Sequence, residues 1–184
     1  MSHRYAKNLP SLWLVTDERV GPDALLAAAE RLPSGQAGVL FRHHRSGGQD
    51  RRALFDRMRV TARRRRLLLL LAGSERQALS WGADGWHGRS GSRAARRAFH
   101  SMAVHDAREL AMAIRAGADL IFLSPLFHTR SHPGAGALGR VRFARLAHCA
   151  PMPVMALGGV RPRHRRMLRL LGAAGWAAID GLMD

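Results

Sequence analysis

The chain has 184 residues, 47% of them hydrophobic, which is enough to bury a core and excludes a wholly disordered protein. Its formal net charge of +17 favours anionic ligands, but the basic residues are spread along the chain without interleaved aromatics, so we expect no specific nucleic-acid binding. The longest apolar run, residues 67–72, is far too short to span a bilayer, and the N-terminal stretch carries no secretory signal.

The arginine and cysteine content of the chain indicates a coding bias and a cellular compartment. Of the 30 basic residues only Lys7 is a lysine, which indicates a coding bias toward arginine. The single cysteine, Cys149, excludes an internal disulfide and fits a reducing cytosol, so we expect a cytoplasmic protein. We expect Cys149 to be a small buried hydrophobic residue. A homodimer is among the assemblies that the sequence leaves open.

Short apolar runs alternate with amphipathic segments of helical length along the whole chain. The predicted strands are Leu12–Thr16, Gly38–Arg42, Leu67–Leu71, Gly85–His87, Ala98–Ser101, Leu120–Ser124, Val154–Leu157 and Ala177–Ile179. The predicted helical stretches include Pro22–Arg31, Arg51–Arg63, Ser74–Trp81, Asp106–Ala116 and Arg163–Leu171.

A short motif recurs where a helix gives way to a strand: "GADGWHG" from residue 82, "GADLIFLSP" from 117 and "GAAGWAAID" from 172. Near-continuous apolar strands separated by helices indicate a parallel sheet covered on both faces, and eight such units close most economically into a (β/α)₈ barrel. A doubly wound open sheet is the alternative. We predict one α/β domain over residues 1–184, a small TIM barrel with a truncated final helix and a flexible segment at 1–10.

Polar residues gather where the predicted strands end, which is the catalytic face of such barrels. After the sixth strand, "FLSPLFHTRSHPGAGALG" (122–139) supplies hydroxyls, imidazoles and a guanidinium in a glycine-rich loop, as a pocket for an anion would. After the seventh strand, Gly158 and Gly159 let backbone N–H groups approach a phosphate. We expect a side chain at Gly158 to block that phosphate without disturbing the fold.

Four motifs in this order resemble the superfamily of thiamine phosphate synthase and TenI-like thiazole tautomerase. They are "LWLVTDERV" (12–20), "GADGWHG" (82–88), "VHDARELAMAIRAGADLIFLSPLFHTRSHPGAGALG" (104–139) and "PVMALGGVRP" (153–162). The resemblance implies a (β/α)₈ barrel and a transferase of thiamine biosynthesis. Synthase members join hydroxymethylpyrimidine pyrophosphate to thiazole phosphate, with Mg²⁺ assisting the departure of pyrophosphate.

The resemblance also implies a site for small phosphorylated substrates. The residues that it assigns to substrate and phosphate binding are Arg42, His44, Thr129, Arg130, Ser131, His132, Gly158, Gly159 and Asp180. Four of these depart from the family pattern: His44 and His132 stand for lysines, Ser131 for a threonine, and Asp180 for a serine at the thiazole phosphate.

The metal ligands of the family are missing. Ala72 and Gly73 stand where the family has Asn-Asp, and "HGRSGS" (87–92) supplies no acid after the fourth strand. Mg²⁺ usually needs one or two carboxylates beside substrate phosphates, so we predict no metal ligand in this chain. Arginines, among them Arg42 and Arg89, are the expected substitutes that neutralise pyrophosphate.

Other activities stay open at this point. A thiazole tautomerase needs a general acid–base, for which His105 and His128 are the candidates because imidazole titrates near neutral pH. For either histidine a solvated or structural role is equally compatible with the sequence. A homologue that binds a phosphorylated ligand without catalysis is the non-enzymatic alternative.

Overall fold

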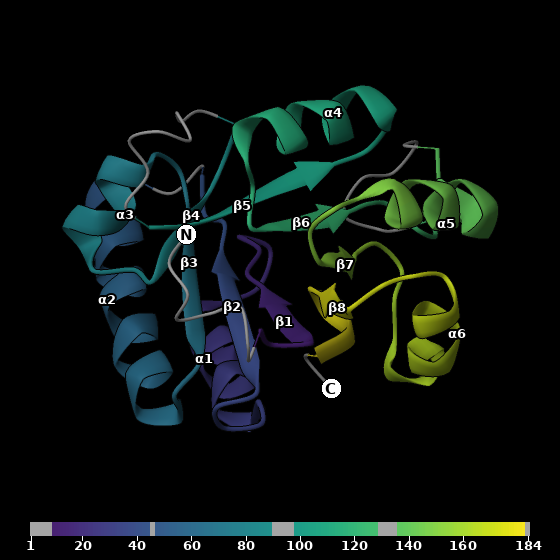
Figure 1. The fold of residues 1–184 in the computed structure, drawn as a ribbon. Coiled ribbons are helices and arrows are strands. Elements are labelled where there is room, and N and C mark those ends of the chain that lie inside the picture. The colour runs from purple at the N-terminus through teal and green to yellow at the C-terminus, as the bar shows by residue number, and fades with distance from the viewer. Residues whose placement is uncertain (1–8, 45–46, 90–97, 129–135, 183–184) are drawn as a thin grey trace.

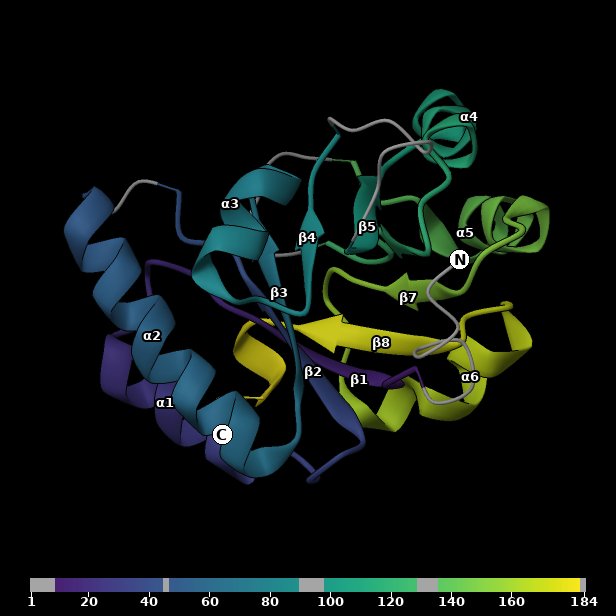
Figure 2. The ribbon, with the colours of Figure 1, turned by 60° about the vertical axis from the view of Figure 1, so that its left-hand side comes forward.

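The computed structural model describes residues 9–44, 47–89, 98–128 and 136–182. Its eight strands are all parallel and form a closed barrel in chain order, with β8 beside β1 (Figures 1 and 2). The strands are β1 (Leu12–Val15), β2 (Ala37–Phe41), β3 (Leu68–Ala72), β4 (Gly85–His87), β5 (Phe99–Val104), β6 (Leu120–Leu123), β7 (Val154–Ala156) and β8 (Gly175–Ala178). The predicted TIM barrel is therefore confirmed.

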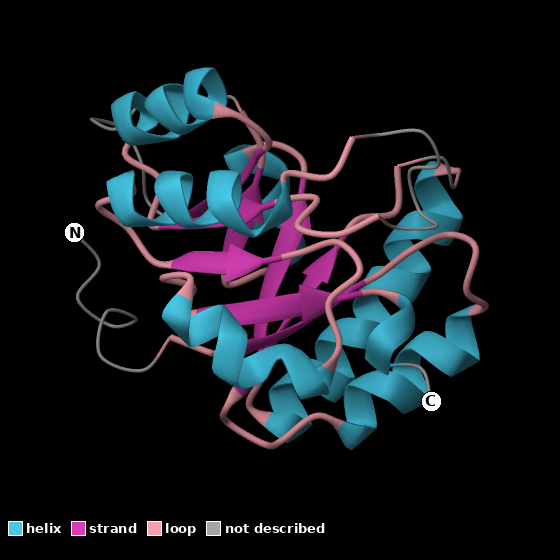
Figure 3. Cartoon of the chain, turned by 90° about the vertical axis from the view of Figure 1, so that its right-hand side faces the viewer, coloured by secondary structure: helices cyan, strands magenta, loops and turns pink. Residues whose placement is uncertain are grey.

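Helices surround the barrel, as Figure 3 shows. They are α1 (Pro22–Arg31), α2 (Gly48–Arg65), α3 (Glu75–Trp81), α4 (Ala107–Ala116), α5 (Gly139–Cys149) and α6 (Arg165–Leu170), with short 3₁₀ turns η1 (Pro162–His164) and η2 (Asp180–Leu182). Within the described residues no α-helix follows β8, in agreement with the predicted truncation. The expectation of a flexible N-terminal segment falls mostly on residues 1–8, which lie outside the described residues.

The barrel interior is filled by side chains from alternate strand positions. Trp13 of β1 and Phe122 of β6 meet edge to face with ring centroids 5.5 Å apart. Gly38 of β2 leaves the room for this indole, since a Cβ there would lie 2.5 Å from two ring carbons of Trp13. The interior is thus a packed core, and any ligand must bind at an end of the barrel.

The recurring Gly-Ala-Asp motif has a structural basis. Gly82 and Gly117 end α3 and α4 in the left-handed conformation, with φ of 74° and 66°. The aspartate two residues later accepts a backbone N–H from the preceding strand of the barrel. Asp84 accepts from Leu69 at 2.8 Å, and Asp119 accepts from His100 at 2.9 Å. These carboxylates therefore fix adjacent strands at the N-terminal end of the barrel.

One expectation about the core is wrong. Cys149 is exposed at the end of α5, because that helix turns Phe143 and Ala147 toward the barrel instead. Among the described residues, no helix is long and apolar enough to cross a membrane.

Candidate functional site

The C-terminal ends of the strands form a rim on which cationic and imidazole side chains meet. Arg42 directly follows β2, whose Leu40 is buried in the barrel interior, and exposed His44 lies two residues further on. The charges of both side chains contribute to lowering the pKa of His87 at the end of β4. Residues from separate strands are thereby assembled at one end of the barrel.

A buried network ties the ends of β1 and β2 together. The hydroxyl of Thr16 accepts the backbone N–H of Arg42 at 2.9 Å and lies 3.0 Å from Nδ1 of His43. The His43 ring stacks on Phe41 with centroids 4.8 Å apart. Burial lowers the pKa of His43, so its ring is neutral at neutral pH. Through the hydroxyl of Thr16, the ring helps to hold the backbone of Arg42 in place.

His87 ends β4 and packs against residues of β5 and β6. Its Nδ1 is 2.9 Å from the hydroxyl of Ser101, and its ring packs on the edge of Phe122 with centroids 5.5 Å apart. Burial and the positive charge of Arg42 lower the pKa of His87 to about 3. The imidazole is therefore neutral at physiological pH and can donate or accept a hydrogen bond without adding charge.

His105 after β5 is held by an acid from the following helix. Oε2 of Glu109 accepts the backbone N–H of His105 at 2.8 Å and lies 2.6 Å from its Nδ1. The other oxygen of Glu109 pairs with Arg89. This arrangement fixes the ring and leaves its Nε2 directed away from the carboxylate, which is how an acid orients a catalytic imidazole. Arg89, which is expected to help neutralise pyrophosphate, is paired with Glu109 in this structure.

Arg51 on α2 reaches the end of β3. Its Nη2 donates to the carbonyl of Ala72 at 2.6 Å, and its guanidinium lies 5.2 Å from the ring centroid of Trp81. Its Nε is buried and has no partner among the described residues. A guanidinium thus stands beside Gly73, where the family resemblance implies a metal-binding aspartate.

Among its described residues, this rim offers no ready set of oxygen ligands for Mg²⁺. Ala72 and Gly73 offer no side-chain oxygen, and the carboxylates of Asp17 and Glu109 are paired with Arg19 and with Arg89 and His105. Glu18 is a third acid of this end of the barrel, and its charge acts on His43, His44 and Arg51. In the described ranges no group of three or more His, Cys, Asp or Glu side chains could hold a metal ion. Positive charge at this rim comes from guanidinium groups instead.

The two glycines after β7 pack against the segment that follows β6. Gly158 and Gly159 have φ of 94° and 64°, and a Cβ on Gly158 would lie 2.7 Å from the Cα of Pro125. A Cβ on Gly159 would lie 2.7 Å from the carbonyl oxygen of His128. The expectation that Gly158 tolerates a side chain without effect on the fold is therefore wrong, because close backbone packing requires a glycine there.

Replacing Gly158 with alanine is expected to destabilise the protein. Positive φ and the contact with Pro125 together should lower the free energy of unfolding by about 2–4 kcal/mol. Urea unfolding followed by circular dichroism measures this. Gly136→Ala is the matched control, since a Cβ at Gly136 has no neighbour within 4 Å. Equal stability of the two variants would contradict the packing argument.

The structure places the predicted site residues unevenly. Arg42, His44, His105 and the two glycines lie at the rim, and exposed His128 lies beside Gly159. Asp180 begins η2 directly after β8. The predicted loop residues Thr129, Arg130, Ser131 and His132 lie outside the described residues.

Sequence reasoning missed three rim residues: Arg51, His87 and Glu109. Glu109 had a detectable signal, since it follows the helix cap Asp106 by three residues as in a capping box. His87 had one too, since it ends the predicted strand Gly85–His87, whereas Arg51 had none, because it reaches the end of β3 from the preceding helix.

The fold and the rim together define a TIM barrel whose functional groups gather at the C-terminal ends of the strands. More specifically, the chain belongs to the thiamine monophosphate synthase family, which matches residues 12–182. The resemblance seen in the sequence is thereby confirmed.

Individual relatives agree with this membership. The chain is 31% identical to the thiamine-phosphate synthase of Methylococcus capsulatus, over 93% of this chain and 81% of that protein. It is 32% identical to the thiamine biosynthesis bifunctional protein ThiM/ThiE of Symbiobacterium thermophilum, over 94% of this chain and 37% of that protein. The thiamine phosphate pyrophosphorylase from Pyrococcus furiosus shares the fold, with a TM-score of 0.80 at 21% identity over 96% of this chain and 88% of that chain.

Proposed function

We propose that this protein is a transferase of thiamine biosynthesis that joins hydroxymethylpyrimidine pyrophosphate to thiazole phosphate, with guanidinium groups in place of metal ligands at the pyrophosphate. Membership of the thiamine monophosphate synthase family supports the reaction. The observation that carries the second part is Arg51, whose guanidinium reaches Ala72 at the end of β3.

In this proposal the rim stabilises the departing pyrophosphate. Negative charge accumulates on the leaving group as its bond to the pyrimidine methylene breaks, and Arg42 and Arg51 oppose that charge from β2 and α2. The hydroxyls of Thr129 and Ser131, with His132, are proposed to donate to the same anion. The N–H groups of Gly158 and Gly159, which donate to no backbone acceptor in the described part of the chain, are proposed to bind the thiazole phosphate.

A thiazole tautomerase is the second candidate, favoured by the contact between His105 and Glu109 at 2.6 Å. A carboxylate that fixes Nδ1 leaves Nε2 to move a proton to and from a ring carbon. This reaction needs no leaving group and would leave Arg42 and Arg51 without a pyrophosphate. His128 is the other proposed acid–base, and its exposed position beside Gly159 is compatible with that role.

The proposal is tested by incubating the full chain with both synthase substrates and measuring thiamine phosphate by chromatography, with Mg²⁺ and with EDTA. We expect product under both conditions, because the cationic side chains supply the neutralisation. Loss of product in EDTA would show that the reaction requires a metal ion and that carboxylates of this chain bind it. Absence of product under both conditions would reject the synthase, and isomerisation of a thiazole carboxylate phosphate in a parallel assay would then establish the tautomerase.

Phosphorylated substrates do not cross membranes unaided, and we propose that the reaction takes place in the cytoplasm. The exposed thiol of Cys149 is compatible with a reducing compartment.

A further inference from the structure

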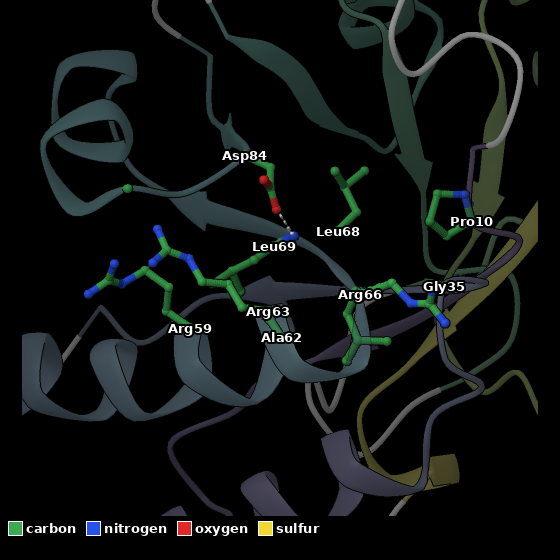
Figure 4. A pocket seen from close by; sticks show the side chains of 11 residues that line it. Pro10, Gly35, Arg59, Ala62, Arg63, Arg66, Leu68, Leu69 and Asp84 are labelled. Carbon is green, nitrogen blue, oxygen red and sulfur yellow. Dashed lines mark hydrogen bonds between the residues drawn. The ribbon is translucent and has the colours of Figure 1, made fainter.

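A pocket of about 340 Å³ opens at the end of the barrel opposite the rim (Figure 4). Its walls come from residues that precede strands: Pro10 before β1, Gly35 before β2 and Asp84 before β4. Leu68 and Leu69 at the start of β3 also line it. The C-terminal ends of the strands, where the proposed reaction occurs, contribute nothing to this pocket.

Three arginines of α2 and its C-cap line one side of the pocket, at helical spacings of four and three residues: Arg59, Arg63 and Arg66. Arg59 Nη1 and Arg63 Nη2 lie 3.5 and 3.9 Å from the position that a Cβ on Gly82 would occupy. In Figure 4 these two extend to the same end of the pocket, whereas Arg66 extends toward Gly35 at the other end. The pocket thus has two cationic ends with the leucines of β3 between them.

These arginines differ from their neighbours on α2 in how their charge is balanced. Arg57 pairs with Asp23 at 2.7 Å, and Arg64 pairs with Glu30, so the face toward α1 is neutralised. Arg63 and Arg66 form no ion pair or side-chain hydrogen bond within the described ranges.

Arg59 is only partly compensated. It shares Asp56 with Arg52, and its Nε is buried with no partner among the described residues. An unsatisfied buried donor is costly, and a bound water or ion is one way to satisfy it.

Asp84, the one acid that lines the pocket, offsets this charge only in part, through the attraction between its carboxylate and Arg63. Oδ2 of Asp84 already accepts the backbone N–H of Leu69 at 2.8 Å, and no ion pair joins Asp84 to an arginine in the described part of the chain. Three guanidinium groups therefore face one carboxylate.

Arg66 occupies a backbone position that normally selects glycine. It follows α2 with φ of 52°, the only described residue other than glycine with a positive φ. Glycine is the preferred residue in this cap, because a Cβ is strained there. An arginine in this strained position is compatible with a role for its side chain in binding.

We propose that this pocket binds a small phosphorylated molecule, at a site separate from the catalytic rim. Guanidinium groups bind phosphate through paired N–H donors, and a pocket of this volume accepts a ligand of nucleotide size. The apolar floor of Leu68 and Leu69 suits the uncharged part of such a ligand. The proposal does not depend on the proposed reaction, since no residue is shared between the two sites.

The test is calorimetric titration of inorganic pyrophosphate into the full chain. We expect Arg63→Gln/Arg66→Gln to remove one binding event or weaken it by at least about tenfold, the loss of a charge-assisted hydrogen bond. Arg142→Gln/Arg145→Gln, which removes the same charge from an exposed face of α5, is the matched control and should bind as the wild type does. Identical isotherms for the two double variants would overturn the proposal.

Failure of the rim proposal gives a different result from failure of this one. If the rim binds no pyrophosphate, the wild type shows one event, which is lost in Arg63→Gln/Arg66→Gln and kept in Arg42→Met. If Arg42→Met alone removes all binding, the pocket is not a pyrophosphate site. An oligonucleotide whose tight binding is lost in Arg63→Gln/Arg66→Gln, while pyrophosphate binding in that variant stays as in the wild type, would assign the arginines to nucleic acid and overturn the proposal.

Arg66→Gly separates binding from folding. Glycine relieves the strain at φ 52°, so the midpoint of thermal unfolding should stay unchanged or rise, while pyrophosphate affinity at the pocket falls. A lower midpoint with unchanged affinity would show that Arg66 is purely structural and would contradict the proposal.

Discussion

Arg42→Met is expected to weaken pyrophosphate binding at the rim about 100-fold, since it removes a full charge together with roughly two charge-assisted hydrogen bonds. The backbone of Arg42 is held by Thr16, so the substitution should leave the fold unchanged. Calorimetric titration of pyrophosphate measures the effect. Arg115→Met is the control, because it removes the same charge from an exposed position at the far end of α4.

Arg51→Met extends this test to the end of β3. It should also weaken pyrophosphate binding, while adding Mg²⁺ should restore neither variant, because Ala72 and Gly73 supply no ligand. The thermal stability of this variant must also be measured, since Arg51 donates a hydrogen bond to the carbonyl of Ala72 and its loss can affect the fold. Affinities equal to that of Arg115→Met would remove both arginines from the site, and rescue by Mg²⁺ would show that a metal is bound there.

Acidification should destabilise the protein through His87. In the unfolded chain, the imidazole of His87 takes up a proton when the pH falls below its usual pKa of 6.5. In the native protein it stays neutral until the pH approaches its lowered pKa of about 3. The unfolded state therefore binds more protons than the native state between these values. As the pH is lowered through this range, the free energy of unfolding decreases by at most about 1.4 kcal/mol per pH unit. Burial also lowers the pKa of His43, which acts in the same direction.

Urea unfolding at pH 7 and pH 5 measures this dependence. His87→Gln keeps a hydrogen-bonding group beside Ser101 and cannot gain charge, so its stability should change less between the two pH values. His148→Gln on the exposed face of α5 is the control and should keep the wild-type slope. The same slope in all three proteins would show that His87 is not the group responsible.

The sequence by itself determined the architecture. Apolar runs such as Leu120–Leu123 must be buried, and Gly117 ends a helix whatever surrounds it, since these are properties of a few adjacent residues. Eight repetitions of this local pattern made the barrel predictable. The rim was predictable for the same reason, because the polar residues that follow each strand must meet at one end of a parallel barrel.

Only the tertiary structure decided what those residues touch. Gly158 proved to be needed for contact with Pro125, and exposed Cys149 proved to be on the outer face of α5. The reach of Arg51 to Ala72 and the burial of His87 depend on contacts between elements far apart in sequence. The distances between packed residues and the burial of each side chain are properties of the closed barrel, and no local pattern of residues encodes them.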